Sequence, residues 1–212
     1  PVHTVPVIEL VENAVDFGLW SSTSRMAHKE GAFRLVYMGR LYALKGLDIT
    51  IDALAEARTR LPEIELSMDI LGDGPELEAL QAQVERLGLA DVVRFPGFLP
   101  QSECAQYLAN GDALILGSLR ECGGAVVLEA MAMARPVVVS HTCAAGSDAT
   151  PGRDYEAASD ADGFVGAIDA LLREPDRAAA MGEAARARVL ARYSWNAHLS
   201  RIDCYLDAPV RG

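Results

Sequence analysis

The 212-residue sequence predicts an α/β fold built on a doubly wound, Rossmann-like parallel sheet. The first observation is an alternation from Phe33 onward, in which short apolar runs are followed by longer stretches of helical period. The second is composition, since 50% of the residues are hydrophobic but only 6% are aromatic. An aliphatic core of this kind is typical of helices packed on a sheet and disfavours a β-sandwich.

The individual elements follow from that alternation. Strands are predicted at residues 33–38, 65–71, 92–95, 113–116 and 136–140, and the intervening helices at 45–60, 75–87, 102–109 and 124–134. Residues 141–154 are rich in Gly, Ala, Pro and Asp, which predicts a loop facing the functional site. Closing helices are predicted at 160–173, 175–192 and 194–206, with Pro175 at a helix start and Ser194 as an N-cap.

These elements divide the chain into three parts. Residues 1–30 are interpreted as an interdomain junction and linker, residues 31–192 as the Rossmann-like domain, and residues 193–212 as a C-terminal helix and tail. The first residues have the character of a strand end and linker and begin at Pro1. We therefore expect a further domain upstream.

Charge and composition narrow the classes of partner and compartment. Nineteen basic and thirty acidic residues give a formal charge of -11, which disfavours binding to nucleic-acid phosphates. The four cysteines include no CxxC pair, so neither a zinc site nor a disulfide framework is indicated. No apolar run approaches the about 18 residues of a membrane span, and residues 1–10 lack the basic start of a signal peptide. We expect a cytoplasmic protein.

The segment GRLYALKG, residues 39–46, is the first candidate ligand loop, because it follows an apolar strand and opens a helix. Gly39 permits a sharp turn at the carboxyl end of the strand, where open α/β sheets bind ligands. Arg40 and Lys45 bracket the turn. A cation at a helix N-terminus opposes the helix dipole, and an anionic ligand would resolve that conflict. The alternative is an exposed lysine that reaches solvent.

The segment ECGGAVVLE, residues 121–129, also joins a strand to a helix. Gly123 and Gly124 permit close approach of the backbone, so the amides of residues 123–126 can point at phosphate or sugar oxygens. Glu121 and Glu129 lie about two helical turns apart and can hydrogen-bond vicinal hydroxyls on one ligand. The alternative is a loop charge and a solvated helix charge. Cys122 has no basic partner in sequence and is interpreted as a small backbone-contact residue.

Together these segments resemble the donor-binding C-terminal domain of GT-B glycosyltransferases, in the retaining set called group 1 or family 4. The resemblance covers residues 13–205 and rests on six motifs that occur in the family's order. They are NAVD (13–16), GRLYALKG (39–46), ILGDGP (70–75), VRFPGFLP (93–100), ECGGAVVLEAMAMARPVVVS (121–140) and YSW (193–195). Each motif alone is weak, whereas all six in register are highly specific.

The resemblance implies a role for each matching residue. Arg40 and Lys45, after Gly39, are expected to hold the donor diphosphate, and Glu129 to hydrogen-bond the nucleotide ribose. Glu121 is expected against the transferred sugar, and Arg40, Lys45 and Glu121 are the expected catalytic residues. The remaining expected contacts lie beside the base (Gly97, Phe98, Leu99) and beside the sugar and phosphate (Cys122, Gly123, Gly124, Ala125, Val126).

The implied reaction is retaining glycosyl transfer from a nucleoside diphosphate sugar to an acceptor. Fixed positive charge and helix-terminal amides would assist departure of the diphosphate, without a metal ion or cofactor. The acceptor would be a glycan or lipid-linked molecule, in assembly of a glycan, polysaccharide or glycolipid. The N-terminal Rossmann domain that supplies the acceptor site in the family is missing, so the isolated chain is expected to be inactive. Through that missing half the protein could sit at the inner face of the membrane.

Two departures from the family pattern leave alternatives open. Ala134 stands where the family usually has Gly, and HTCAAGSDATPGRDYE replaces the usual Gly-rich loop after the PVVVS strand. The second departure, together with the absence of the N-terminal half, keeps a non-catalytic nucleotide-sugar-binding or scaffold domain under consideration. A nucleotide-sugar epimerase or sugar-phosphate synthase of the GT-B fold is a further alternative, because it would use a similar diphosphate loop.

Overall fold

A computed structural model describes residues 14–21, 31–119, 124–144 and 149–194. Within them, six parallel strands form one sheet in the order β3-β2-β1-β4-β5-β6. The strands are β1 (Ala32–Met38), β2 (Glu65–Leu71), β3 (Val93–Gly97), β4 (Ala113–Leu116), β5 (Val137–Ser140) and β6 (Glu156–Ala158). This is the strand order of a dinucleotide-binding Rossmann sheet, and it reverses between β1 and β4. The predicted fold class is confirmed.

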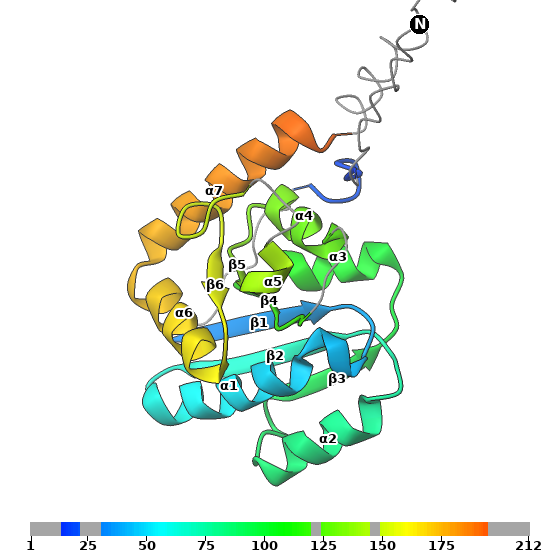
Figure 1. The fold of residues 1–212 in the computed structure, drawn as a ribbon, viewed down its shortest axis with the longest axis vertical. Helices are drawn as coiled ribbons and strands as arrows, with labels where there is room; N and C mark the ends of the chain where they lie inside the picture. Colours follow the sequence, from blue (N-terminus) through cyan, green and yellow to red (C-terminus); the bar gives the residue numbers. More distant parts are fainter. Residues whose placement is uncertain (1–13, 22–30, 120–123, 145–148, 195–212) are drawn as a thin grey trace, which may run out of the picture.

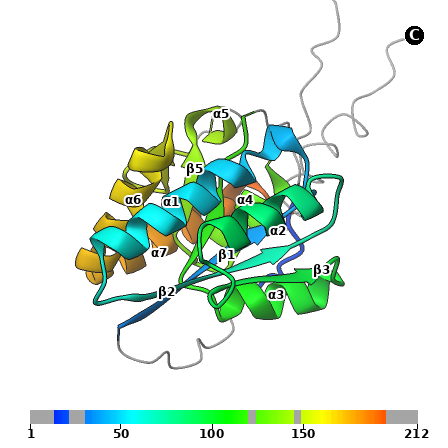
Figure 2. The ribbon, with the colours of Figure 1, turned by 90° about the horizontal axis from the view of Figure 1, so that it is seen from below.

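Helices cover both faces of the sheet (Figures 1 and 2). The first face carries α1 (Leu47–Arg60), α2 (Leu77–Arg86) and α6 (Ala161–Arg173), and α1 packs against both of the others. The second carries α3 (Gln101–Ala109), α4 (Ala125–Ala132) and α7 (Pro175–Arg192), of which α4 and α7 pack together. Every residue of β4 and β5 is buried, as expected for strands that helices cover on both sides.

Local sequence explains where the closing helices begin. The side chain of Asp160 accepts a hydrogen bond of 2.9 Å from the Gly163 amide and so caps α6. Pro175 starts α7, where its missing N–H costs nothing. The apolar residues of α6 recur on one face, which buries Phe164, Ile168 and Leu171 in the core. The predicted bounds 160–173 and 175–192 agree with these helices within one residue.

Ala134 follows α4 with a φ of +53°, in the left-handed region. A glycine adopts this conformation without the strain that a Cβ atom introduces. Gly182 of α7 packs against the same turn, since a Cβ there would lie 2.2 Å from the Ala134 oxygen. The unusual alanine therefore stands at a strained helix end that also forms the contact between α4 and α7.

Residues 14–21 pack onto the domain beside the end of α7. Val15 and Trp20 are both buried in the core. The Val15 amide donates to the Tyr193 carbonyl oxygen over 2.9 Å, and Val15 forms an isolated bridge with Ser194. A carboxylate oxygen of Asp16 accepts a 2.8 Å hydrogen bond from the Gly18 amide and closes the turn that precedes Trp20. The segment thus enters the domain next to the point where α7 ends.

The structure differs from the predicted elements in three places. Helix α1 begins at Leu47, because a short 3-10 helix at Ala43–Lys45 and a left-handed Gly46 precede it. Residues 141–154 are not all loop, since α5 occupies His141–Ala144. Strand β6 was not predicted, because Glu156–Ala158 has no β-branched or aromatic residue and pairs only through β5. The predicted helix 194–206 lies outside the described residues after Ser194.

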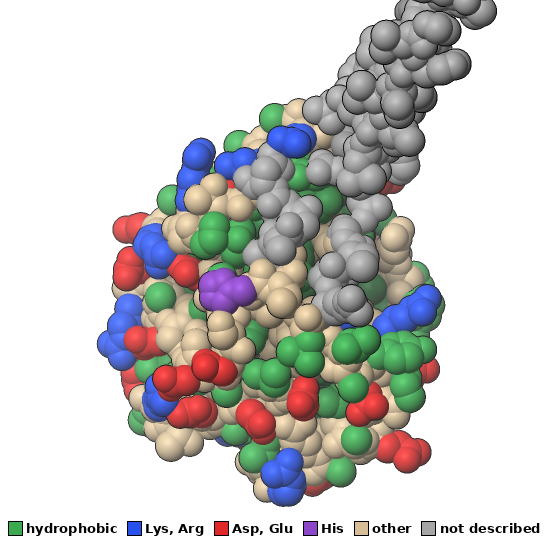
Figure 3. Space-filling model, viewed as in Figure 1, with side chains coloured by type: hydrophobic (Ala, Val, Ile, Leu, Met, Phe, Trp, Pro, Cys, Tyr) green, Lys and Arg blue, Asp and Glu red, His purple; other side chains and the backbone are tan. Residues whose placement is uncertain are grey.

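Acidic and basic side chains are interspersed on the face shown in Figure 3, and no broad basic patch gathers there. Among the described helices, none is long and apolar enough to cross a membrane.

Candidate functional site

The loops that follow β1, β2 and β4 fit together backbone to backbone at the carboxyl edge of the sheet. Gly46 has a φ of +57°, and a Cβ on it would lie 2.1 Å from the Gly117 oxygen. A Cβ on Gly72 would lie 1.8 Å from the Gly39 oxygen. No other residue type permits these approaches. Glycine therefore fixes the geometry of the edge at which ligands of open α/β sheets bind.

A cleft of about 610 Å³ opens over this edge. It brings together residues from three of the predicted segments, which are far apart in sequence. The predicted residues in its wall are Gly39, Arg40, Phe98, Leu99, Val126 and Glu129. The wall also contains Trp20, Met38, Tyr42, Leu71, Gly72, Asp73, Gly74, Pro100, Gln101 and Cys104. One cleft thus collects an arginine, a carboxylate and an exposed aromatic ring.

Hydrogen bonds fix the backbone at Arg40 and at the residue before it. The Gly39 amide donates to the Leu71 oxygen over 3.0 Å, and the Tyr37 hydroxyl donates to the Arg40 oxygen over 3.0 Å. The Arg40 side chain is exposed at the cleft wall. Lys45 is half-buried at the end of the 3-10 helix and does not line the cleft. The two predicted cations therefore occupy different positions, and a role for Lys45 in ligand binding stays a prediction.

Glu129 is the one carboxylate that α4 carries, and it lies half-buried in the cleft wall. Burial raises the pKa of this carboxyl from 4.5 to about 7. Within the described part of the chain, no hydrogen bond or ion pair engages it. Burial, and secondarily the charge of Glu129, raise the pKa of the Cys104 thiol from α3. A buried carboxylate without a partner is costly, and ligand hydroxyls would offset that cost.

Helix α4 begins beside the same cleft after Gly124, whose φ is +35°. Its first backbone hydrogen bonds come from the amides of Val127 and Leu128, both to the Gly124 oxygen. The amides of the first helical residues are left for another acceptor, as at any helix start. Val126 lines the cleft, whereas Gly124 and Ala125 do not. The predicted residues Glu121, Cys122 and Gly123 lie outside the described residues.

The segment after β3 forms the opposite wall. Gly97 ends β3, and its oxygen accepts a 2.9 Å hydrogen bond from the Gly72 amide. Gly97 itself does not line the cleft. Phe98 is 84% exposed, and Leu99 is half-buried beside it. The exposed ring of Phe98 is therefore available to stack on a planar ligand group.

Sequence reasoning assigned no role to Trp20, Asp73 or Cys104, which also line the cleft. The sequence could have indicated Asp73 as a site residue, because the Gly-Asp-Gly segment follows β2 at the same edge of the sheet as the two predicted loops. Trp20 could not be placed from sequence, since its position depends on how residues 14–21 pack against the domain. Cys104 is brought to the cleft by the packing of α3, and no local pattern marks it.

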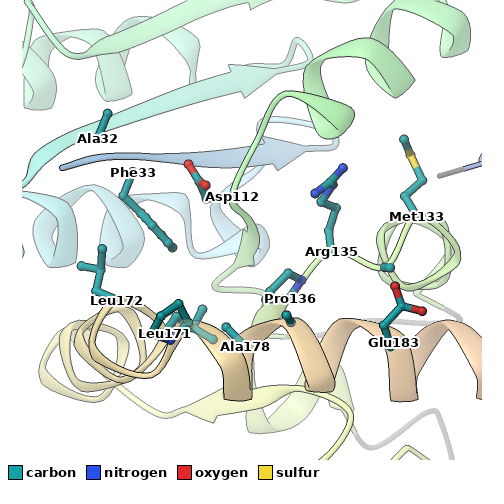
Figure 4. Close-up of a pocket in the computed structure, with 13 residues that line it drawn as sticks. Ala32, Phe33, Asp112, Met133, Arg135, Pro136, Leu171, Leu172, Ala178 and Glu183 are labelled. Atoms are coloured by element: carbon teal, nitrogen blue, oxygen red, sulfur yellow. The ribbon is translucent and has the colours of Figure 1, made fainter. Parts of the chain in front are cut away.

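A second hollow of about 430 Å³ lies at the amino ends of the strands, away from the ligand edge. Figure 4 shows Asp112 and Arg135 above the apolar residues Pro136, Leu171 and Ala178, with Phe33 beside Asp112. Glu183 projects from α7 at its rim. No predicted site residue lies here, so the functional candidate is the cleft at the carboxyl edge.

The fold and this cleft define a Rossmann-like domain with a candidate ligand site at the carboxyl edge of its sheet. Comparison with known proteins makes the assignment specific, because the family described as glycosyl transferases group 1 matches residues 22–188. The chain belongs to this family.

A curated relative and two solved structures illustrate the likeness. The chain is 34% identical to a GDP-mannose-dependent alpha-(1-6)-phosphatidylinositol monomannoside mannosyltransferase of Mycolicibacterium smegmatis, over 79% of this chain and 46% of the relative. Anabaena Alr3699/HepE, solved in complex with UDP and glucose, gives a TM-score of 0.81 at 23% identity, covering 94% of this chain and 56% of that one.

The C-terminal domain of a group 1 glycosyl transferase (LpcC) from Francisella tularensis gives a TM-score of 0.74 at 18% identity. That match covers 85% of this chain and 99% of the solved domain. The chain spans about half the length of the curated relatives it matches.

Proposed function

We propose that this chain binds a nucleoside diphosphate sugar and serves as the donor-binding half of a retaining, metal-independent glycosyltransferase. The observation that carries the proposal is the cleft of about 610 Å³ that unites Arg40, Phe98 and Glu129. The relative from Mycolicibacterium smegmatis is named for GDP-mannose, and Anabaena HepE was solved with UDP and glucose. The chemistry common to both is a nucleoside diphosphate and a sugar.

Each part of such a donor has a matching group in the cleft. The exposed Arg40 guanidinium would bind the diphosphate through charge-assisted hydrogen bonds, each contributing about 1 to 2 kcal/mol after screening by solvent. The free amides at the start of α4 would add hydrogen-bond donors to phosphate or sugar oxygens. The Glu129 carboxylate would accept hydrogen bonds from the two ribose hydroxyls, and Phe98 would stack on the base.

These groups also suit the chemical step. As the bond between the anomeric carbon and the diphosphate breaks, negative charge grows on the leaving phosphate. Backbone contacts of the carboxyl edge hold the chain at Arg40, and the helix itself holds the α4 amides, so these donors would be in place to stabilise that charge. The acceptor site, and a surface that closes the cleft over the donor, would come from a preceding domain. We therefore expect donor binding, and no efficient sugar transfer, from this chain alone.

Calorimetric titration tests the proposal directly. The 212-residue chain is titrated with UDP, GDP, uridine and guanosine, each with and without EDTA. At least one diphosphate should bind at least tenfold more tightly than its nucleoside, with no change on addition of the chelator, because charge-assisted hydrogen bonds to phosphate are lost in the nucleoside. Equal affinity for diphosphate and nucleoside would refute the diphosphate site, and a requirement for a metal ion would refute metal independence.

A further inference from the structure

Two hydroxyl groups at the end of β5 converge on one backbone oxygen. The Thr142 hydroxyl donates to the Ser118 carbonyl oxygen over 2.6 Å, and the Ser140 hydroxyl donates to the same oxygen. The two hydroxyl oxygens lie 3.0 Å apart, and the Ser140 oxygen also accepts from the Cys143 amide over 3.3 Å. Ser118 is fully buried and Ser140 is 8% exposed. Thr142 itself is exposed, so the contact lies at the surface and reaches a buried backbone oxygen.

The strands themselves explain why side chains are needed at this point. The pairing of β4 with β5 ends at Leu116 and Val139, because the chain turns into α5 directly after Ser140. The Ser118 oxygen lies beyond that last pair. A buried carbonyl oxygen without a donor is costly. The two hydroxyls replace the backbone donors that a longer strand would have supplied.

The other side of the same stretch, Gly117–Leu119, contacts the loop that carries Arg40. The Leu119 amide donates to the Leu44 oxygen over 2.9 Å. A Cβ on Gly117 would lie 2.3 Å from the Gly46 oxygen, so the two backbones touch. The stretch is thus held between the hydroxyl pair on one side and the 39–46 loop on the other.

We propose that Ser140 and Thr142 are positioning residues for the diphosphate-binding loop. Their hydroxyls fix the Ser118 carbonyl, which fixes Leu119 and, through Leu44 and Gly46, the loop that presents Arg40. The inference rests on the proposed function, because it assigns these residues to the phosphate part of that site. It also gives a role to Thr142, which lies in the segment HTCAAGSDATPGRDYE that departs from the family pattern.

The test is Thr142→Val, which keeps the shape of the side chain and removes the hydroxyl. Thr59→Val is the matched control, since the Thr59 hydroxyl also donates to a backbone oxygen, that of Ala55 in α1, over 3.1 Å. Calorimetry is run with UDP, GDP and their nucleosides. For Thr142→Val we expect at least a threefold loss of affinity for the diphosphate and less than a twofold change for the nucleoside. Thr142→Ser should restore the diphosphate affinity, and Thr59→Val should leave both unchanged.

Amide hydrogen exchange gives a readout that does not depend on nucleotide. Exchange at Leu119 should accelerate at least threefold in Thr142→Val and not in Thr59→Val. Unchanged exchange at Leu119, or an equal loss for diphosphate and nucleoside, would overturn the positioning role. If the wild-type chain binds neither ligand, the proposed function itself fails and the inference fails with it. Should Thr142→Val not fold, Thr142→Ala removes the same hydroxyl without a branched side chain and is measured in the same way.

Discussion

Replacing Glu129 with glutamine should make the domain more stable at alkaline pH. Burial raises the pKa of the Glu129 carboxyl from 4.5 to about 7 in the folded chain. At about 1.36 kcal/mol per tenfold change in an equilibrium constant, this difference corresponds to about 3 kcal/mol. The group is neutral in both states below about pH 4.5, and there its contribution to stability is complete. As pH rises from about 4.5 to about 7, the unfolded chain ionises this carboxyl while the folded chain keeps its proton, and that contribution is lost.

Glutamine keeps the size of the side chain and cannot ionise. Near pH 5 the free energies of unfolding of wild type and Glu129→Gln should therefore differ by less than about 1 kcal/mol. At pH 8 the variant should be more stable by up to about 3 kcal/mol. Urea unfolding followed by circular dichroism at pH 5, 6, 7 and 8 measures this difference. Other titrating groups are common to both proteins and cancel.

Glu85→Gln is the matched control, because Glu85 is an exposed carboxylate in the last turns of α2. The free energy of unfolding of Glu85→Gln should stay close to that of wild type at every pH. A difference for Glu129→Gln that does not change with pH would refute the reasoning, as would a variant less stable than wild type at pH 8. Either result would mean that a partner in the folded protein stabilises the Glu129 carboxylate.

Four further outcomes are expected. Affinity for a nucleotide sugar, whose diphosphate does not titrate near neutrality, should rise about tenfold from pH 6 to 8 as Glu129 ionises, and calorimetry on Glu129→Gln should give a flat profile. Arg40→Gln should weaken diphosphate binding by about 1 to 2 kcal/mol and leave nucleoside binding unchanged, whereas Arg86→Gln on α2 should change neither. Phe98→Ala should weaken nucleoside binding by about 1 kcal/mol without lowering Tm, because the ring is 84% exposed; a fall in Tm would indicate a structural role. Ala134→Gly should raise the free energy of unfolding by about 1 kcal/mol, since φ is +53° there; a variant less stable than wild type in urea would show that the alanine is not strained.

The parts of the fold that sequence could predict are those with a strong local pattern. The strands with continuous apolar runs, such as 113–116, and the helices with a cap or an initial proline were placed within one or two residues. Strand β6 and helix α5 were missed because their residues have weak preferences and depend on pairing with β5 or on the contact with Ser118. Local sequence does not contain that information.

In the candidate site, too, the motifs predicted some of the residues, whereas the positions of others depend on how the chain folds around them. The motifs predicted that Arg40, Glu129 and the 97–99 segment serve one ligand, and three of the strand and helix ends do bring Arg40, Glu129, Phe98 and Leu99 to one cleft. The motifs could not predict that Lys45 lies outside the wall, because it belongs to a short 3-10 helix before Gly46 and not to the first turn of α1. Glu121 lies outside the described residues, so its expected contact with the sugar remains a prediction.

The structure of the carboxyl edge links stability to the proposed binding chemistry. Gly39, Gly46, Gly72 and Gly117 let three loops meet without side chains between them, so the position of Arg40 is set by backbone contacts that form when the sheet forms. Glu129 lowers the stability of the domain when it ionises, because it is half-buried and has no partner in the described part of the chain. A rigid loop beside a destabilised carboxylate is the arrangement expected of a site preorganised for a ligand that brings both negative phosphate and neighbouring hydroxyls. A glycine-to-alanine change at Gly46 would therefore be expected to displace the 39–46 loop. Glu129→Gln would leave the loop in place, remove the negative charge and replace one of the two acceptor oxygens with an amide donor.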